Sequence, residues 1–487
     1  MDNLSDYFSR FREGIVGNHL EYETPYGTKK LLYADWIASG RLYRPIEEKL
    51  LHEIGPWVAN THTETSEAGS IMTQAYHYAH SLIKKHVNAG PQDVIITNGF
   101  GMTGVLVKFQ RILGLKTCGI LQHSECLNKS EKPVVFITHM EHHSNQTSWY
   151  ETIADVVVIP PGNGLLVDPE MLRTELEKYK GRKKLIGSFS ACSNVTGIET
   201  PYHELAKIMH EAGGVCFVDF AASAPYVNIN MHPSDPLECL DAIFFSPHKF
   251  LGGPGASGVL IFNKQLYHQG TPDQPGGGTV NWTNPWGGYR YIDDIEIRED
   301  GGTPGFLQAM KTALCIGLKN EMGVENMRKR EKELVEKAFK ELRKIPGIHI
   351  LADNVEDRLG ILSFCLDHAH YNLVVKLLSD RFGIQARGGC ACAGTYGHYL
   401  LDVTFEKSAQ ISKFISMGDL SSKPGWIRLS LHPTMTDDEL DCCLEAIRQI
   451  SLHHEEWGKD YSYDKHANEF RHKHDNDRKN KIIGSWF

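Results

Sequence analysis

Residues 244–260 read FFSPHKFLGGPGASGVL and join an apolar strand pattern to a reactive side chain. The apolar run ends at Ser246, and a proline, a histidine and Lys249 follow it directly. A lysine that is desolvated at the end of a buried strand loses proton affinity and can form a Schiff base. The alternative is an ordinary surface lysine in a turn. The glycines after Lys249 predict a tight turn before the next apolar run.

Four more short apolar runs precede this stretch, at intervals typical of alternating strands and helices. With residues 242–246 (AIFFS), the runs are 134–138 (VVFIT), 156–160 (VVVIP), 185–190 (LIGSFS) and 215–220 (VCFVDF). Continuous runs of this kind are typical of parallel strands buried on both faces. The amphipathic stretch at 201–214, PYHELAKIMHEAGG, predicts a helix between two of them. The pattern predicts an α/β fold with a mostly parallel sheet flanked by helices.

The composition and charge of the chain disfavour some classes of function and location. The 487 residues carry a formal net charge of -9, which disfavours nucleic acid as a partner. No apolar run reaches the ~20 residues that a membrane span needs. The first residues, MDNLSDYFSRFREGIVG, lack the order of a signal peptide, so we expect a cytoplasmic protein. The eleven cysteines are then expected to be mostly reduced, and their odd number argues against a fully paired framework.

The character of the chain changes along its length. The connection at 275–294, PGGGTVNWTNPWGGYRYIDD, is rich in Gly, Pro and Trp, and a strongly helical stretch follows. We expect an N-terminal segment (1–30), a large cofactor domain (31–297), a smaller α+β domain (298–451) and a polar tail (452–487). We expect the polar, histidine-rich tail to be solvated. The alternative is that its histidines bind a metal ion.

Polar residues lie at the ends of four of the five predicted strands. They are His142, Asn194, Asp219 and Lys249. Because ligands bind beyond the carboxyl ends of parallel strands, we expect these side chains to converge on one crevice. Asp219 suits a partner for a protonated ring nitrogen, as pyridoxal phosphate requires, although a helix cap or a buried ion pair is the alternative. Small residues at 97–104 precede an apolar helical stretch and predict a phosphate site at its start.

At this point the sequence resembles the class V, fold-type I enzymes that depend on pyridoxal phosphate, in particular the cysteine desulfurase branch with selenocysteine lyases and molybdenum cofactor sulfurase. The resemblance covers about residues 30–450. The matching segments, in chain order, are YADWIASGR (33–41), NTHT (60–63), TNGFGMT (97–103), HMEHHSN (139–145), SNVTG (193–197), VDFAAS (218–223), FFSPHKFLGGPGASGVL (244–260), PGGGT (275–279) and GWIRLSLHPTMTDDEL (425–440). The lysine segment is the most specific of them.

The resemblance implies a role for each matched residue. Lys249 forms the Schiff base with pyridoxal phosphate, His142 stacks on its ring, and Asp219 pairs with its nitrogen. The implied substrate contacts are Arg428 at the carboxylate, together with His62, Asn194 and Ala38. A guanidinium fork suits a carboxylate. Thr279 is expected to reach the cofactor phosphate across a homodimer interface, as in the family.

Two departures from the family pattern change the expected contacts. Ala222 stands where the family has a glutamine that contacts the cofactor's ring oxygen, so Ser223 or Asn194 becomes the candidate donor. Phe100 and Gly101 replace the threonines of the phosphate loop. Their backbone amides, with the side chains of Thr103, Ser246 and His248, are then expected to hold the phosphate.

The stretch RGGCACAG at 387–394 lies where the desulfurases carry their catalytic loop, and its CAC resembles molybdenum cofactor sulfurase. The alignment places Cys392 on the nucleophile and Cys390 beside it, as a thiol that relays or protects the sulfur. Arg387 or His398 supplies positive charge that lowers a thiol pKa. Half of a zinc site and a purely structural tight turn are the alternatives.

The predicted function is removal of sulfur or selenium from cysteine or selenocysteine, with alanine as product and a persulfide on the enzyme. A sulfur-acceptor protein is a candidate partner. The alternatives are an aminotransferase, β-lyase or epimerase of the same class that acts without a thiol, and a pseudoenzyme that binds pyridoxal phosphate without turnover.

Overall fold

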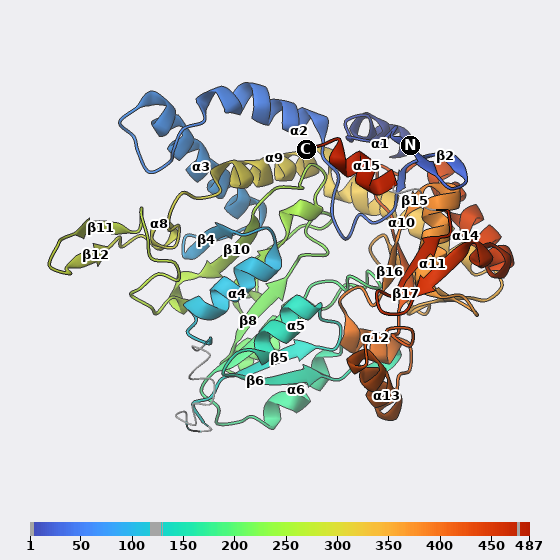
Figure 1. Cartoon of the computed structure of the whole chain (residues 1–487). Helices are drawn as coiled ribbons and strands as arrows, with labels where there is room; N and C mark the ends of the chain where they lie inside the picture. The colour runs from blue at the N-terminus through green and yellow to red at the C-terminus, as the bar shows by residue number, and fades with distance from the viewer. Residues whose placement is uncertain (1–3, 117–127, 129, 475–477) are drawn as a thin grey trace.

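The fold is built on a seven-stranded sheet, seen in the computed structural model, which describes residues 4–116, 128, 130–474 and 478–487 (Figure 1). The strand order is β4-β10-β9-β8-β7-β5-β6. The strands are β4 (Asp93–Asn98), β5 (Val134–Thr138), β6 (Asp155–Ile159), β7 (Leu185–Ser190), β8 (Val215–Asp219), β9 (Ala242–Phe245) and β10 (Gly258–Asn263). Strand β10 runs antiparallel to both neighbours, and the other pairs are parallel. The predicted α/β class is confirmed.

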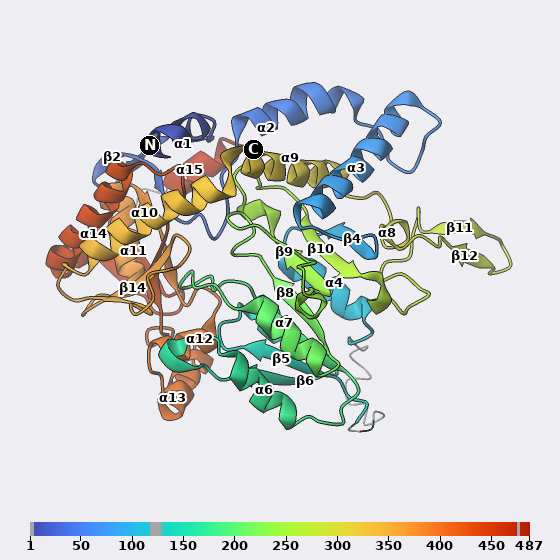
Figure 2. The same cartoon turned by 180° about the vertical axis from the view of Figure 1, so that it is seen from behind.

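Both faces of the sheet are buried. On β5, Val134 and Phe136 face one hydrophobic core, whereas Val135 and Ile137 face another. This follows from the alternation of side chains along a strand, and it explains the continuous apolar runs in the sequence. Helices α4 (Met102–Ile112) and α5 (His143–Tyr150) cover one face (Figure 1), and α6 (Pro169–Glu177) and α7 (Tyr202–Glu211) cover the other (Figure 2).

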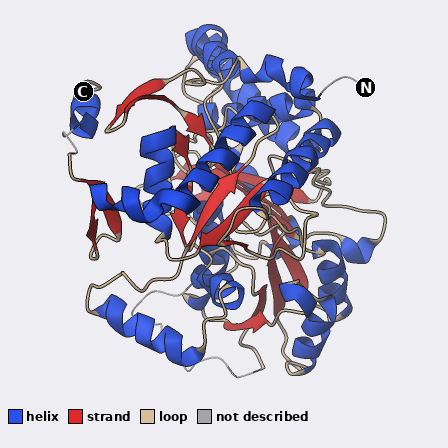
Figure 3. Cartoon of the chain, turned by 90° about the vertical axis from the view of Figure 1, so that its right-hand side faces the viewer, coloured by secondary structure: helices blue, strands red, loops and turns tan. Residues whose placement is uncertain are grey.

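A second, smaller sheet has its own core. Its order is β13-β14-β17-β16, from β13 (Ile348–Ile350), β14 (Ile361–Leu366), β16 (Arg387–Gly389) and β17 (Trp426–Ser430). Helices α10 (Val324–Leu342), α11 (Tyr371–Phe382) and α14 (Asp437–Trp457) pack on it. Figure 3 shows strands in the interior with helices around them, and further short strands at the periphery.

Gly323 lies between a helix of the large sheet and a helix that packs mainly on the small one. Helix α9 (Phe306–Met322) packs on α3 (Glu67–His86) in a core of the large sheet, whereas the buried residues of α10 from Leu334 to Leu342 belong to the core of the small sheet. We propose that each sheet with its helices is one domain and that the chain passes from one to the other near Gly323, one long helix after the limit at 298 expected from the sequence.

The N-terminal segment joins both parts of the molecule. Helix α1 (Leu4–Arg12) buries Phe8 and Phe11 in the core of the large sheet. The hairpin of β1 (Glu21–Thr24) and β2 (Gly27–Lys30) leads to β3 (Leu32–Tyr33), which pairs in parallel with β15 (Ile384–Gln385).

The end of the chain forms further structure. Helix α14 continues to Trp457, and a hairpin of β18 (Tyr461–Asp464) and β19 (Glu469–His472) follows before α15 (Arg478–Gly484). Tyr461 and His472 are buried, so the segment predicted as a polar tail is only partly solvated. Within 4–116, 128, 130–474 and 478–487, no group of His, Cys, Asp or Glu is arranged to hold a metal ion.

The remaining elements lie at the edges of the two cores. They are α2 (Arg44–Lys49), a π-helical turn (Leu50–Ile54), the projecting hairpin of β11 (Val280–Thr283) and β12 (Tyr289–Tyr291), α8 (Ile295–Arg298), α12 (Gly394–Leu400) and α13 (Phe405–Ser416). Among the helices in the described part of the chain, none is long and apolar enough to cross a bilayer.

Candidate active site

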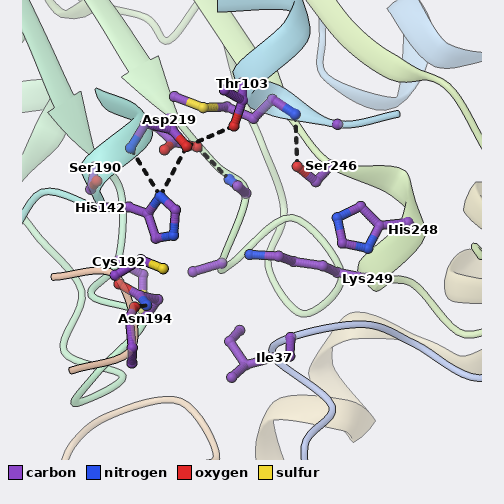
Figure 4. A pocket seen from close by; sticks show the side chains of 18 of the residues that line it. Ile37, Thr103, His142, Ser190, Cys192, Asn194, Asp219, Ser246, His248 and Lys249 are labelled. Carbon is purple, nitrogen blue, oxygen red and sulfur yellow. Dashed lines mark hydrogen bonds between the residues drawn. The ribbon is translucent and has the colours of Figure 1, made fainter. Parts of the chain in front are cut away.

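A cavity of about 510 Å³ lies at the carboxyl ends of the parallel strands. The four polar residues predicted to converge after the strands, His142, Asn194, Asp219 and Lys249, all line it (Figure 4). The other predicted site residues on its wall are Ala38, Phe100, Gly101, Thr103, Ser246, His248, Cys392 and Arg428. These segments are distant in the sequence and meet because parallel strands end at one edge of the sheet.

Apart from Ser223, which is described below, three predicted site residues lie elsewhere. His62 lines a separate cavity of about 410 Å³, together with Gly278. Thr279 is buried beside that cavity, where its hydroxyl donates a hydrogen bond to the Gly276 carbonyl at 2.7 Å. Cys390 lines a groove on the outer side of the cysteine loop. A single copy of the chain therefore does not bring these three residues to the cavity wall.

Lys249 ends a short 3-10 turn (Pro247–Lys249) directly after β9. A β-carbon on Gly253 would lie 1.9 Å from the Pro247 carbonyl oxygen, so this close backbone approach requires a glycine. Figure 4 shows Lys249 reaching into the space that His142 and Asn194 also border. Burial lowers the pKa of Lys249 to about 8, although the charge of Asp219 opposes the shift. The amine is therefore partly neutral near physiological pH and able to attack a carbonyl group.

Asp219 is the last residue of β8 and is buried. Its carboxylate accepts a hydrogen bond from the Ala221 amide at 2.7 Å. Burial raises the pKa of Asp219 to about 7, against the effects of this hydrogen bond and of Lys249. A cationic group placed beside the carboxylate would stabilise its ionised form.

His142 precedes α5 and caps its first turn. Its Nδ1 accepts a hydrogen bond from the Ser144 amide at 3.1 Å, which leaves the proton of the neutral ring on Nε2. Burial, together with the charge of Lys249, lowers the pKa of His142 to about 3. The ring on the cavity wall is therefore neutral at physiological pH and presents a flat surface (Figure 4).

The residue before it, Glu141, anchors this turn. Its carboxylate is buried and accepts hydrogen bonds from the Thr138 hydroxyl at 2.6 Å, the Ser190 amide at 3.0 Å and Asn145 Nδ2 at 2.8 Å. These contacts tie the ends of β5 and β7 to α5, so Glu141 fixes the backbone that carries His142. The sequence analysis did not single out Glu141, although it lies inside the HMEHHSN segment.

The start of α4 offers a cradle for an anion. Gly101 is its N-cap residue, and a β-carbon there would lie 3.1 Å from Ser246 Oγ. The Ser246 hydroxyl accepts a hydrogen bond from the Met102 amide at 2.8 Å, and the Thr103 and Ser144 hydroxyls lie 2.6 Å apart. The Phe100 side chain is 83% exposed, so this residue contributes its backbone. Amide and hydroxyl donors at a helix start suit a phosphate.

Arg428 is buried on the opposite wall. Its Nη1 donates to the Asn194 carbonyl at 3.0 Å, and its Nη2 donates to Asp35 Oδ1 at 2.9 Å. Arg387 Nε donates to the other oxygen of Asp35 at 3.0 Å. Asp35 was missed in the sequence analysis, where the only signal was an acidic residue inside the apolar segment YADWIASGR.

The cysteine loop is a tight turn. The Ala393 amide donates to the Cys390 carbonyl at 3.0 Å, and the two residues between them have positive φ, 49° at Ala391 and 57° at Cys392. This is the backbone pattern of a type I′ turn, which non-glycine residues adopt at a cost. Asn194 Nδ2 donates to the Ala391 carbonyl at 2.7 Å, and the His143 amide donates to the Cys392 carbonyl at 2.7 Å. The exposed Cys392 is thereby fixed at the mouth of the cavity.

Two further details bear on the expected ring contacts. Ala222 lines the cavity, whereas Ser223 is buried away from its wall and its hydroxyl has no hydrogen-bond partner among the described residues. Asn194 Oδ1 is also buried without a partner in that part of the chain. Cys192, which the sequence analysis passed over, lines the cavity as a second thiol beside Cys392. Burial raises the pKa of Cys192 well above its usual range, so it stays a neutral thiol.

Comparison with known proteins identifies relatives along most of the chain. The aminotransferase class-V family model matches residues 32–442. A probable cysteine desulfurase of Halalkalibacterium halodurans is 26% identical over 403 residues, covering 80% of this chain and 91% of the relative. One of Staphylococcus epidermidis is 27% identical over 377 residues, covering 76% and 85%.

Solved structures share the fold. The cysteine desulfurase of Thermococcus onnurineus superimposes with a TM-score of 0.71 at 20% identity, covering 91% of this chain and 98% of that one. A cysteine desulfurase of Escherichia coli gives 0.67 at 20% identity, covering 93% and 99%. The fold and the family match agree, and the chain therefore belongs to the aminotransferase class-V family and is an enzyme of its pyridoxal-phosphate-dependent, transferase or lyase type.

Proposed function

We propose that this protein is a cysteine desulfurase-like enzyme. It would take sulfur from L-cysteine, or selenium from selenocysteine, and leave alanine and a persulfide or its selenium counterpart on Cys392. The observation that carries the proposal is that Lys249, Arg428 and the exposed thiol of Cys392 line one cavity. The names of the curated relatives, probable cysteine desulfurases, support it.

The residues of the cavity fit pyridoxal phosphate. Lys249 would hold the cofactor covalently, Asp219 would face its ring nitrogen, and the flat, neutral ring of His142 would stack on it. The small cradle at Gly101, with Thr103, Ser246 and His248, would hold the phosphate, because a side chain at Gly101 would fill that space. When bound, pyridoxal phosphate supplies an electron sink for negative charge at the substrate's α-carbon.

Substrate binding follows from Arg428. Its guanidinium is buried and already held by Asp35 and Asn194, so it presents a fixed direction to a carboxylate. Arg428 Nε has no hydrogen-bond partner among the described residues and could donate to the substrate carboxylate. Ala38 on the facing wall leaves room for the substrate. The Lys249 amine, with its lowered pKa, would then accept the α-proton and return a proton to the product.

The thiol completes the reaction. The Cys392 thiolate would attack the substrate sulfur, forming a new S–S bond as the carbon–sulfur bond breaks, and the carbon fragment takes a proton and leaves as alanine. The adjacent Cys390 would relay or protect the sulfur. This chemistry needs reduced thiols, which agrees with the cytoplasmic location expected from the sequence.

We also propose a homodimer. His62 and Thr279 lie together at a second cavity, away from Lys249 in the same chain, which supports their donation to the site of a second copy. A sulfur-acceptor protein is the proposed partner for the Cys392 sulfur.

The test compares two cysteines of one loop. The loaded enzyme and its Cys392→Ala and Cys390→Ala variants are incubated with L-cysteine and a thiol reductant, and alanine and sulfide are both measured. We expect Cys392→Ala to lose about 100-fold or more of both products, as expected for loss of a nucleophile. Cys390→Ala is the matched control and should keep most of the rate.

Other outcomes separate the alternatives. Unchanged sulfide and alanine in Cys392→Ala would refute the thiol mechanism. Pyruvate in place of alanine would indicate a β-lyase. If the wild-type protein, mixed with pyridoxal phosphate, shows no visible absorbance band that Lys249→Ala abolishes, the proposed cofactor role of Lys249 is wrong.

A further inference from the structure

A second hollow lies on the outer side of the cysteine loop. We call it the outer groove; its volume is about 1120 Å³. It is bordered by α11, by β16 and the loop after it, by β19 and by the start of α15. Cys392 lines both this groove and the active cavity, so this residue borders the two hollows. A group that leaves the sulfur of Cys392 on the outer side enters this groove.

The outer groove has more basic than acidic side chains. Its cationic lining residues are Lys376, Arg387, Lys423, Arg471, Arg478 and Lys479, against the acidic Asp380 and Glu469. Three of these cations have acidic partners: Lys376 pairs with Asp380 at 3.0 Å, Arg387 with Asp35 at 3.0 Å and Arg471 with Glu469 at 3.5 Å. Lys423, Arg478 and Lys479 make no ion pair within the part of the chain that the structure describes. The whole chain carries a net charge of -9, so this positive field is local.

One wall of the groove lies outside the family match. The β18–β19 hairpin and α15 lie beyond residue 442, where the family match ends. The hairpin is firmly seated on α11, because Asn372 Nδ2 donates to the Asn468 carbonyl at 2.6 Å and Asn468 Nδ2 donates to the Tyr371 hydroxyl at 2.8 Å. The groove is therefore preformed, and it is not a feature that the family match accounts for.

We propose that the outer groove docks an acidic segment of a thiol-bearing acceptor protein and brings the acceptor thiol to Cys392. The inference rests on the proposed function, which places transferable sulfur on Cys392. The acceptor thiolate attacks the outer sulfur of the Cys392 persulfide, a new S–S bond forms as the old one breaks, and Cys392 leaves as a thiolate. Atoms and electrons balance without a further oxidant or reductant.

The lining favours this occupant over others. Pockets that enclose small molecules are mostly apolar, whereas this groove is wide and rich in charged side chains. Nucleic-acid sites belong to chains or domains with a net positive charge, unlike this one. Complementary charge steers a protein partner and fixes its position in the groove. The exposed Cys392 on the groove wall is the thiol that a partner fixed in this way would reach.

The probe is a fluorescein-labelled peptide that is rich in Glu and Asp and contains one cysteine. A neutral control peptide has the same sequence with Gln in place of Glu and Asn in place of Asp. Binding to the cofactor-loaded enzyme is measured by fluorescence anisotropy at low and high salt. We expect the acidic peptide to bind at least about tenfold more tightly at low salt and to lose this advantage at high salt. The double variant Lys423→Glu/Lys479→Glu should weaken acidic-peptide binding about tenfold.

The control variant is Lys180→Glu, which reverses an exposed lysine on the opposite domain. It should bind the acidic peptide as the wild type does. Equal binding of both peptides, or equal losses in the groove and control variants, would overturn the proposal. Tighter binding of a single-stranded oligonucleotide than of the acidic peptide would also overturn it.

A second measurement tests whether the docked peptide places its cysteine at Cys392. The cysteine of each peptide is activated as a thiopyridyl disulfide, and the part of the thiopyridone release that is lost in Cys392→Ala reports attack by Cys392. The acidic peptide should react about tenfold faster than the neutral one, and the groove variant should lose the difference. Neither readout needs desulfurase turnover. If turnover fails while the acidic peptide docks, only the proposed function is wrong; if turnover succeeds without docking, only this inference is.

Discussion

Asp35 holds Arg428 in a buried ion pair, with Arg428 Nη2 donating to Asp35 Oδ1 at 2.9 Å. The other oxygen of Asp35 accepts from Arg387, the residue that opens the cysteine loop segment. One carboxylate therefore connects the proposed substrate-binding arginine with the strand that leads to Cys392. Sequence separations of 393 and 352 residues are bridged by these two contacts.

Replacing Asp35 by Asn should destabilise the protein. The change leaves a buried guanidinium without its counter-charge, which costs about 3 kcal/mol of unfolding free energy. The measurement is the urea midpoint of the variant. Asp293→Asn is the control, because it removes an exposed pair with Arg290 and should cost less than about 1 kcal/mol. Equal midpoints for the two variants would contradict this account of Asp35.

The amine of Lys249 should titrate well below an ordinary lysine. Its pKa of about 8 means that the reactive neutral form appears as the pH rises through 8, rather than through the usual ~10.4. Reductive methylation with formaldehyde in the cofactor-free protein, followed by mass spectrometry, gives the rate at Lys249 against pH. The exposed Lys180 is the internal control.

The charge of Asp219 should influence the titration of Lys249. Its negative charge favours the ammonium form of Lys249, so Asp219→Asn should move the midpoint of Lys249 to lower pH. A midpoint that stays in place, or moves up, would show that the two groups do not interact as the structure indicates.

Stability should also respond to this lysine. A lysine whose folded-state pKa is lowered binds fewer protons when folded than when unfolded between pH 8 and about 10.4, so its contribution to stability rises with pH across that window. Urea midpoints of the wild type and Lys249→Met over this range check the sign. We expect the stability of the wild type to increase relative to that of the variant as the pH rises. A decrease would contradict the lowered pKa of Lys249.

Glu141→Gln should weaken both stability and the placement of His142. The amide cannot accept all of the hydrogen bonds that Thr138, Ser190 and Asn145 donate, and a buried donor without a partner costs about 1–3 kcal/mol. The readouts are the urea midpoint and the visible circular dichroism of the bound cofactor. A variant with the wild-type midpoint would show that the carboxylate is dispensable.

Gly389→Ala should change the backbone of the cysteine loop while leaving the residues that bind the cofactor in place. Gly389 has a φ of +114°, where an alanine costs about 1–3 kcal/mol, although no atom lies within 4 Å of an added β-carbon. We expect slower alanine formation with unchanged cofactor binding. Gly270→Ala is the matched control, because its site is equally open and its φ lies outside the left-handed region. Equal rates for both variants would show that the loop geometry does not limit the reaction.

Much of the large domain was predictable because its signals are local. The five apolar runs coincide with β5 to β9 to within about a residue, since a strand buried on both faces needs an unbroken apolar stretch. The convergence of His142, Asn194, Asp219 and Lys249 also follows, because parallel strands present their carboxyl ends at one edge. The end of the chain was harder: the hairpin at Tyr461 and His472 is polar along most of its length, and only packing on α11 reveals its place.

The sequence by itself determined five of the seven strands of the large sheet, the position of Lys249 after a buried strand and the family resemblance, because each depends on residues close together in the chain. Tertiary structure alone decided which distant charges meet. It pairs Asp35 with Arg428 and Arg387, separates His62 and Thr279 from the cavity of their own chain, and puts Cys392 between that cavity and the outer groove. Such contacts depend on how the two sheets and their helices are set against each other, and no local pattern of residues encodes that arrangement.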